Sequence, residues 1–108
     1  MKSIFPVIFI SAMLFCIVPF AAAADAAAGK EVYAKKCASC HGAEGEGNEK
    51  IAQLMKVEIK NLGAKEIQAK SDAELKKAVM EGVGKMKPPK DVTAKNVDDV
   101  LAYLRTLA

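Results

Sequence analysis

The chain has 108 residues, enough for one domain at most, and its 16 Lys and Arg against 13 Asp and Glu give a formal net charge of +3. This mild charge comes without any basic run interleaved with aromatic residues, so we expect no nucleic acid binding. The chain has three cysteines and one histidine, and two of the cysteines stand beside that histidine in the segment CASCH. We therefore expect the chemistry of the protein near that segment.

The N-terminal segment is typical of a secretory signal peptide. Lys2 precedes an almost wholly apolar stretch, residues 4–20, which is followed by a run of alanines. Small residues of this kind precede the bond that a signal peptidase cuts. The sequence therefore predicts export to the periplasm.

We place the cleavage after Ala22, Ala23 or Ala24. The chain is accordingly divided into a signal peptide, residues 1–23, and a mature domain, residues 24–108. After cleavage only two cysteines remain, and in an exported protein we expect both thiols to be consumed.

Two other uses of the N-terminal segment stay open. It could remain as a membrane anchor, although an apolar stretch that contains Pro6 and Pro19 is marginal for spanning a bilayer. Cys16 could carry a lipid, but the residue before it, Phe15, is bulky where lipoprotein processing requires a small one. We favour cleavage and expect a mature protein that is not embedded in the membrane.

The first helix of the mature chain is expected from about Asp25 to Lys36. Asp25 suits the N-cap position, and Gly29, Val32 and Tyr33 recur at the spacing of one helix face. This helix leads directly into the cysteines.

A glycine-rich loop, residues 42–47, follows the histidine, and a short helix is predicted over residues 48–55. Residues 56–60 alternate polar and apolar side chains, as a strand does. Because no partner strand is evident, we interpret this segment as an extended loop.

Two further helices are predicted, over residues 72–81 and 94–106, and the chain is therefore expected to be all-α. Ser71 and Glu74 have the spacing of a capping box, and Thr93 suits the N-cap of the last helix. The buried face of that last helix is expected to consist of Val97, Val100, Leu101 and Leu104.

The segment CASCH contains Cys37, Cys40 and His41, and two cysteines three residues apart in a helical turn project to the same side. A disulfide would leave the histidine without a role, a thioredoxin-like pair needs a βαβ context, and zinc needs further ligands. Covalent haem attachment uses all three side chains, with two thioethers and an imidazole bound to the iron. The sequence therefore predicts one covalently bound haem c.

The single histidine leaves the second axial position of the iron to another side chain. Methionine there suits electron transfer, and the mature chain offers Met55, Met80 and Met86. We favour Met86, because it lies in the segment GVGKMKPPK, where glycines let the backbone approach a flat ring and prolines stiffen the loop. Met55 and Met80 stay open as alternatives.

Three segments, GKEVYAKKCASCHG, SDAELKKAVMEGVGKMKPP and VDDVLAYLRTL, resemble the class I monohaem cytochromes c, in particular the small bacterial c6, c551 and c5 types. The resemblance spans the mature chain and implies a small all-α fold, with three main helices around one haem. It implies that Cys37 and Cys40 form the thioethers and that His41 and Met86 are the axial ligands.

The resemblance also implies that the first and last helices cross at close range. One departure concerns His41: many family members have a proline soon after CxxCH whose carbonyl binds the imidazole, but here none occurs between Cys40 and Pro88, so we expect a backbone carbonyl in residues 48–56 instead. By the same resemblance, the residues that meet where the first and last helices cross are Gly29 and Tyr33 on the first helix, and Val100 and Tyr103 on the last.

The implied function is that of a soluble periplasmic electron carrier. Such a protein is not an enzyme, and we expect a monomer that exchanges electrons with other redox proteins. If the distal position were open, gas binding or weak peroxidase activity would be the alternative. The lysines expected to steer acidic partners, unless they are simply solvated, are Lys35, Lys36, Lys85, Lys87 and Lys90. The apolar residues expected around the haem are Val32, Leu54, Leu62, Ile67, Leu75, Val79, Val100 and Leu104.

Overall fold

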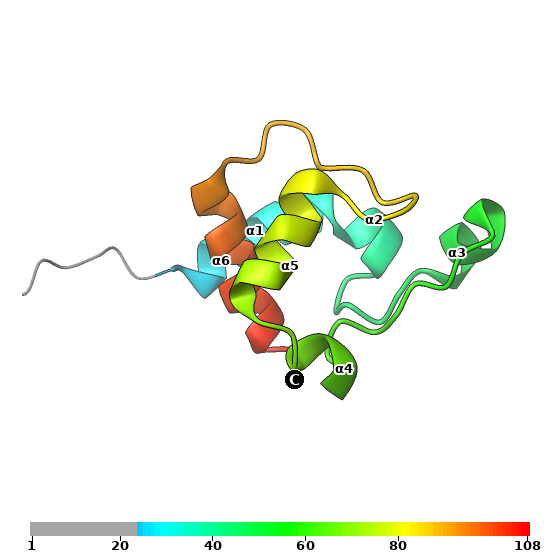
Figure 1. The fold of residues 1–108 in the computed structure, drawn as a ribbon, viewed down its shortest axis with the longest axis horizontal. Coiled ribbons are helices and arrows are strands. Elements are labelled where there is room, and N and C mark those ends of the chain that lie inside the picture. The colour runs from blue at the N-terminus through cyan, green and yellow to red at the C-terminus, as the bar shows by residue number, and fades with distance from the viewer. Residues whose placement is uncertain (1–23) are drawn as a thin grey trace, which may run out of the picture.

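The structure is a computed structural model that describes residues 24–108, so the predicted signal peptide lies outside the described residues. The described chain forms six helices and no strand, which confirms the all-α prediction (Figure 1). These helices are α1 (Ala26–Lys36), α2 (Ala38–His41), α3 (Glu49–Met55), α4 (Lys65–Gln68), α5 (Asp72–Glu81) and α6 (Ala94–Arg105).

The long helices begin at the residues whose side chains suit a cap. Asp25 Oδ1 accepts the N–H groups of the first turn of α1, and Thr93 forms a full capping box with Asn96 at the start of α6. Ser71 caps α5 by accepting the N–H of Glu74. The return bond of the predicted box is not formed there, so only half of that prediction holds.

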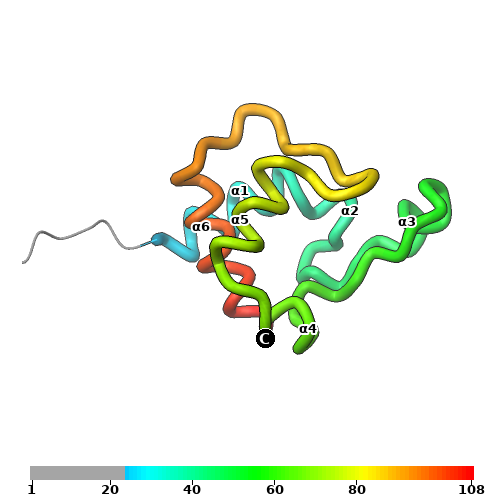
Figure 2. The backbone as a smooth tube through the Cα atoms, viewed as in Figure 1, coloured from blue at the N-terminus to red at the C-terminus, as the bar shows by residue number. Residues whose placement is uncertain are grey.

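Helices α1 and α6 cross at close range, as Figures 1 and 2 show at the left of the molecule. Gly29 lies at the crossing: a Cβ atom added there would come 1.9 Å from the carbonyl oxygen of Asp99. Only a residue without a side chain allows two backbones to approach this closely. Helix α5 packs against α6 beside this pair.

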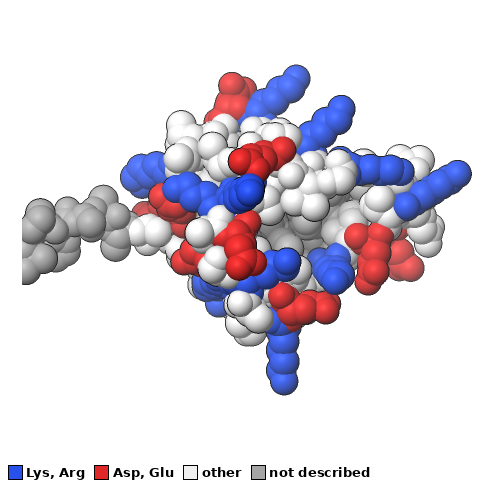
Figure 3. Space-filling model, viewed as in Figure 1, with Lys and Arg blue, Asp and Glu red and all other residues white. Residues whose placement is uncertain are grey.

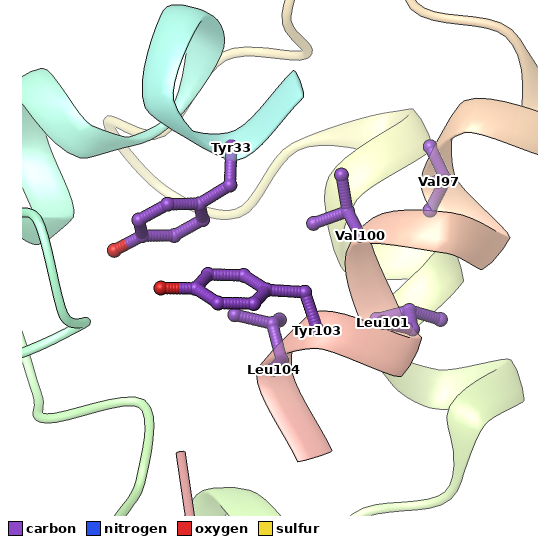
Figure 4. Close-up of a cluster of buried hydrophobic side chains, with 6 residues drawn as sticks. All are labelled: Tyr33, Val97, Val100, Leu101, Tyr103 and Leu104. Carbon is purple, nitrogen blue, oxygen red and sulfur yellow. The ribbon is translucent and has the colours of Figure 1, made fainter. Parts of the chain in front are cut away.

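The core is small and lies mainly on α6, as Figure 4 shows. The rings of Tyr33 and Tyr103 pack against each other, with centroids 5.2 Å apart and planes inclined at 57°. The four residues predicted for the buried face of α6 are all buried. The complete cluster consists of Tyr33, Val97, Val100, Leu101, Tyr103 and Leu104.

Helix α4 has only four residues and was not predicted. Side chains distant in sequence hold it in place. The side-chain N–H of Gln68 donates to the carbonyl of Leu104 at 2.9 Å, and Arg105 Nη1 donates to the carbonyl of Gln68 at 2.9 Å. Arg105 also binds Asp72 Oδ1 through Nε and Nη2, at 3.1 and 2.7 Å, and so joins the α4–α5 junction to α6.

Candidate functional site

Cys37, Cys40 and His41 lie on one helical turn that begins where α1 ends. Cys37 terminates α1 and caps α2, and its carbonyl accepts the N–H groups of Cys40 at 3.3 Å and His41 at 3.0 Å. Both thiols are free and half-buried. Burial, together with the neighbouring Cys40, raises the pKa of the Cys37 thiol. The turn therefore presents two thiols and an imidazole close together.

The loop after this turn folds back and fixes it. Gly47 N donates to the carbonyl of His41 at 2.6 Å, and Asn48 N donates to that of Cys40 at 2.9 Å. The Asn48 side chain adds a bond to the carbonyl of Ser39 at 3.1 Å. These bonds satisfy carbonyls that the end of a short helix leaves without partners. The glycine-rich composition of residues 42–47 thus serves a tight return of the chain, with Gly42 at a φ of 84°.

Two core tyrosines connect the α1–α6 crossing to the same loop. Tyr33 Oη donates to the carbonyl of Gly42 at 2.5 Å, and Tyr103 Oη donates to that of Ala43 at 3.4 Å. Burial of the ring, with Cys37 nearby, raises the pKa of Tyr33 to about 12. The hydroxyl therefore stays a donor at ordinary pH. The sequence predicted that Tyr33 lies on one face of the first helix, but no sequence pattern predicts a hydrogen bond from its hydroxyl to a loop.

The imidazole of His41 is half-buried, and its Nδ1 atom is enclosed without a hydrogen-bond partner. The carbonyl expected within residues 48–56 does not accept from it, so that expectation was wrong: the N–H and side chain of Asn48 bind α2 instead. Burial lowers the pKa of His41. A neutral imidazole is the form that binds a metal.

Met86 ends a two-residue turn that follows α5. Its N–H donates to the carbonyl of Val83 at 2.9 Å, and Val83 N donates to the carbonyl of Met86 at 3.0 Å. Gly82 has a φ of 82°, and a Cβ atom there would come 2.6 Å from the Met86 carbonyl oxygen. Gly84 has a φ of 56° at the first central position of the turn, where glycine is favoured. The glycines before Met86 therefore shape its loop.

A bond that the sequence did not indicate ties this turn to α3. Lys85 Nζ donates to the carbonyl of Met55, the last residue of α3, at 2.5 Å. Lys56 follows in the left-handed conformation, with a φ of 54°, and ends the helix. The turn that carries Met86 is thus fixed at one point to a segment 30 residues earlier in the chain.

The three candidate methionines differ in exposure. Met86 and Met55 are half-buried, whereas Met80 on α5 is 42% exposed. Two other large apolar side chains are also left open, Leu54 at 79% and Val83 at 60% exposure. Leu54 was expected to cover a haem, and nothing within the described chain covers it.

The five lysines expected to steer partners are all exposed. Lys35 and Lys36 occupy the last turn of α1, and Lys85 is engaged by the carbonyl at the end of α3. Figure 3 shows basic and acidic side chains interspersed over the visible face, without a continuous patch of either sign. On that face, charge alone does not mark out one docking surface.

Within residues 24–108, no group of three or more His, Cys, Asp and Glu is arranged to hold a metal ion. In the same part of the chain, no helix is long and apolar enough to cross a membrane. The described residues thus provide no protein-only metal centre.

The family model described as cytochrome c matches residues 26–108, which includes every described helix. No curated protein matches the chain.

Proposed function

The chain belongs to the cytochrome c family, and we propose that within this family it is a soluble periplasmic electron carrier with one low-spin His/Met haem. Cytochromes c bind haem c covalently and are typically electron carriers rather than enzymes. The observation that carries the proposal is the CASCH turn, which has two free thiols and an enclosed imidazole nitrogen without a partner.

The residues present fit a haem. A buried polar atom normally has a hydrogen-bond partner, so the unpaired Nδ1 of His41 indicates an imidazole whose interactions the protein alone does not complete. Leu54, Met80 and Val83 leave apolar surface in contact with water. A large planar apolar group would remove such surface from water, which is favourable.

The roles follow from the chemistry of the side chains. Cys37 and Cys40 would hold the haem through thioethers, His41 would be one axial ligand and Met86 the other. The bound haem supplies a one-electron ferrous–ferric couple. The protein contributes a fixed ligand turn, held by Tyr33 and by the return loop, and apolar side chains that exclude water.

We further propose that residues 1–23 are the export signal and residues 24–108 the mature domain, which acts as a monomer in the periplasm. Export supports the haem proposal, because CxxCH attachment takes place outside the cytoplasm. The docking face for acidic redox partners is proposed around the exposed Lys35, Lys36, Lys87 and Lys90. Lys85 would contribute charge there in addition to its bond to Met55.

The test is an absorption spectrum of the exported, haem-loaded protein, oxidised and then reduced. We expect sharp low-spin bands of a c-type haem and a near-infrared sulfur-to-iron charge-transfer band. That band should be lost in Met86→Ala and kept in the matched controls Met80→Ala and Met55→Ala. A high-spin spectrum in the unaltered protein would contradict the carrier proposal and favour ligand binding or peroxidase chemistry.

A further inference from the structure

One buried carboxylate has no evident part in holding a haem. Asp99 on α6 is 3% exposed, and within residues 24–108 no other charged residue is buried. Its Oδ1 accepts the backbone N–H of Asp25 at 2.9 Å. Lys95 Nζ approaches Oδ2 at 3.2 Å, but the side chain of Lys95 is 68% exposed. The buried charge is thus balanced only by an exposed lysine and one neutral amide.

A carboxylate removed from water requires a close positive partner, because its lost hydration is otherwise not compensated. An exposed lysine is a weak partner, since water screens it and its side chain loses entropy on pairing. From outside α6, the Asp99 carboxylate accepts a hydrogen bond from the backbone nitrogen of Asp25. If the chain began at that residue, this nitrogen would be an ammonium group and the hydrogen bond would be charge-assisted.

The sequence before Asp25 permits such a start. Signal peptidases require small residues at the first and third positions before the cut. A cut after Ala22 would put the bulky Phe20 at the third position, whereas cuts after Ala23 and after Ala24 both place alanine at the two positions. The sequence therefore leaves two sites, one residue apart.

The structure distinguishes the two sites. The bonds of the fold begin at Asp25, whose side chain caps α1 and whose carbonyl accepts Gly29 N at 2.9 Å. Ala24 is exposed and borders a hollow that is also lined by Asp72, Asp98 and Asp99.

Each of these three carboxylates pairs with a basic side chain, but only Asp99 is buried, and its lysine is largely exposed. Asp98 pairs with Lys76 at 2.8 Å and Asp72 with Arg105 at 2.7 Å. An ammonium group at Asp25 would lie within hydrogen-bond distance of the buried Asp99, at the position of the nitrogen that already donates to it, whereas no hydrogen bond joins Ala24 to this carboxylate.

We propose that a signal peptidase cuts the Ala24–Asp25 bond and that the new ammonium group of Asp25 forms an ion pair with Asp99. The hydrolysis consumes one water: Ala24 takes the new carboxylate, and Asp25 keeps the amine, which binds a proton. The dipole of α1 disfavours a cation at this end, but the carboxylate of Asp99 accepts from this nitrogen and the carboxylate of Asp25 caps the same turn. The inference rests on the proposed export signal and is independent of the axial ligands.

The cut is tested by the intact mass and N-terminal sequence of the haem-loaded protein purified from the periplasm. A chain that starts at Asp25 is the expected result. A start at Ala24, or at any earlier alanine, would overturn this inference and leave the export signal standing. An uncut chain would overturn both.

The ion pair is tested by measuring the pKa of the α-amine by NMR in the same protein. An amine beside a buried carboxylate should have its pKa raised above the ordinary value of about 7.7, by about one unit, or tenfold in proton affinity. In Asp99→Asn the amine should return to the ordinary value, while the matched control Asp98→Asn should leave it raised. Equal amine pKa values with and without the Asp99 charge would overturn the pair.

Stability gives a second readout that does not depend on Asp99→Asn folding well. The ion pair raises the pKa of the amine in the folded protein above its value in the unfolded chain. The stability that the pair adds is therefore complete at a pH below the pKa of the unfolded chain, and it is lost as the pH rises through the pKa of the folded protein. A chain made to start at Ala24, with Asp99 intact, should melt a few degrees lower at pH 7. Equal melting temperatures of the two starts would contradict the proposal.

Discussion

The close crossing of α1 and α6 makes Gly29→Ala the most informative change for the fold. A Cβ atom at this position would come 1.9 Å from the carbonyl oxygen and 2.3 Å from the carbonyl carbon of Asp99. Ordinary contact begins at 3.4 Å, so the helices would have to separate by about 1.5 Å. Both clashing atoms belong to the backbone of α6, and no side-chain rotation relieves them.

Two opposing effects determine how much Gly29→Ala lowers the free energy of unfolding. Overpacking costs about 3 kcal/mol at the upper end of its usual range, which applies because backbone must move. Alanine favours a helix over glycine by about 1 kcal/mol. The net loss of unfolding free energy is therefore about 2 kcal/mol, which corresponds to a fall in melting temperature of roughly 10 °C for a domain of this size.

The assay is guanidinium and thermal unfolding of the haem-loaded protein, followed by far-ultraviolet circular dichroism. Gly84→Ala is the matched control, since a Cβ atom there meets nothing within 4 Å and only the φ of 56° is unfavourable, by about 1 kcal/mol. If Gly29→Ala were as stable as the unaltered protein, or more stable, the argument from backbone contact would be refuted.

Three further predictions concern the surroundings of the site. Tyr33→Phe should remove the part of the alkaline destabilisation that occurs as the pH rises from 10 to 12, roughly 2 to 3 kcal/mol, because the raised pKa of Tyr33 lets only the neutral phenol fit the fold. Lys85→Gln should make the Met86-dependent charge-transfer band disappear at a lower denaturant concentration, whereas Lys87→Gln should not. Arg105→Lys should lower the free energy of unfolding by about 1 to 2 kcal/mol, measured in guanidinium, because a lysine cannot reproduce the fork of bonds to α4 and α5.

Each of these has a contrary outcome. Identical alkaline unfolding of the protein with Tyr33 and with phenylalanine would show that the phenol is not held neutral by the fold. Equal effects of the Lys85 and Lys87 changes would show that the bond to the end of α3 does not stabilise the Met86 turn. An unchanged free energy of unfolding in Arg105→Lys would show that the forked bonds of Arg105 do not stabilise α4.

Local signals predicted the long helices and the ligand turn. Thr93 at the start of α6 needs only residues within one turn to form its cap. The proximity of Cys37, Cys40 and His41 likewise follows from their spacing on a helical turn. The close approach at Gly29 was correctly expected from the family resemblance, and the structure gives its physical reason in the backbone of Asp99.

Features that depend on distant residues were not predictable in this way. Helix α4 is too short for any periodicity, and the Arg105 bond that holds it joins residues 37 positions apart. The bond from Lys85 to Met55 spans 30 positions. The acceptor expected for His41 was wrong, because the path of the return loop determines which carbonyl lies near the imidazole. The bonds of Asn48 to the carbonyls of α2 fix that path.

The pairing of α1 with α6 has a consequence for how the chain acquires its structure. The bond between Asp25 and Asp99 closes a loop of 74 residues, and most buried side chains lie on α6. Contacts this distant in sequence carry a large entropy of closure and slow folding. The segment from α1 through α5 therefore has almost no core until the last helix arrives. During that interval the thiols of Cys37 and Cys40 remain on an open chain, accessible for the attachment of haem.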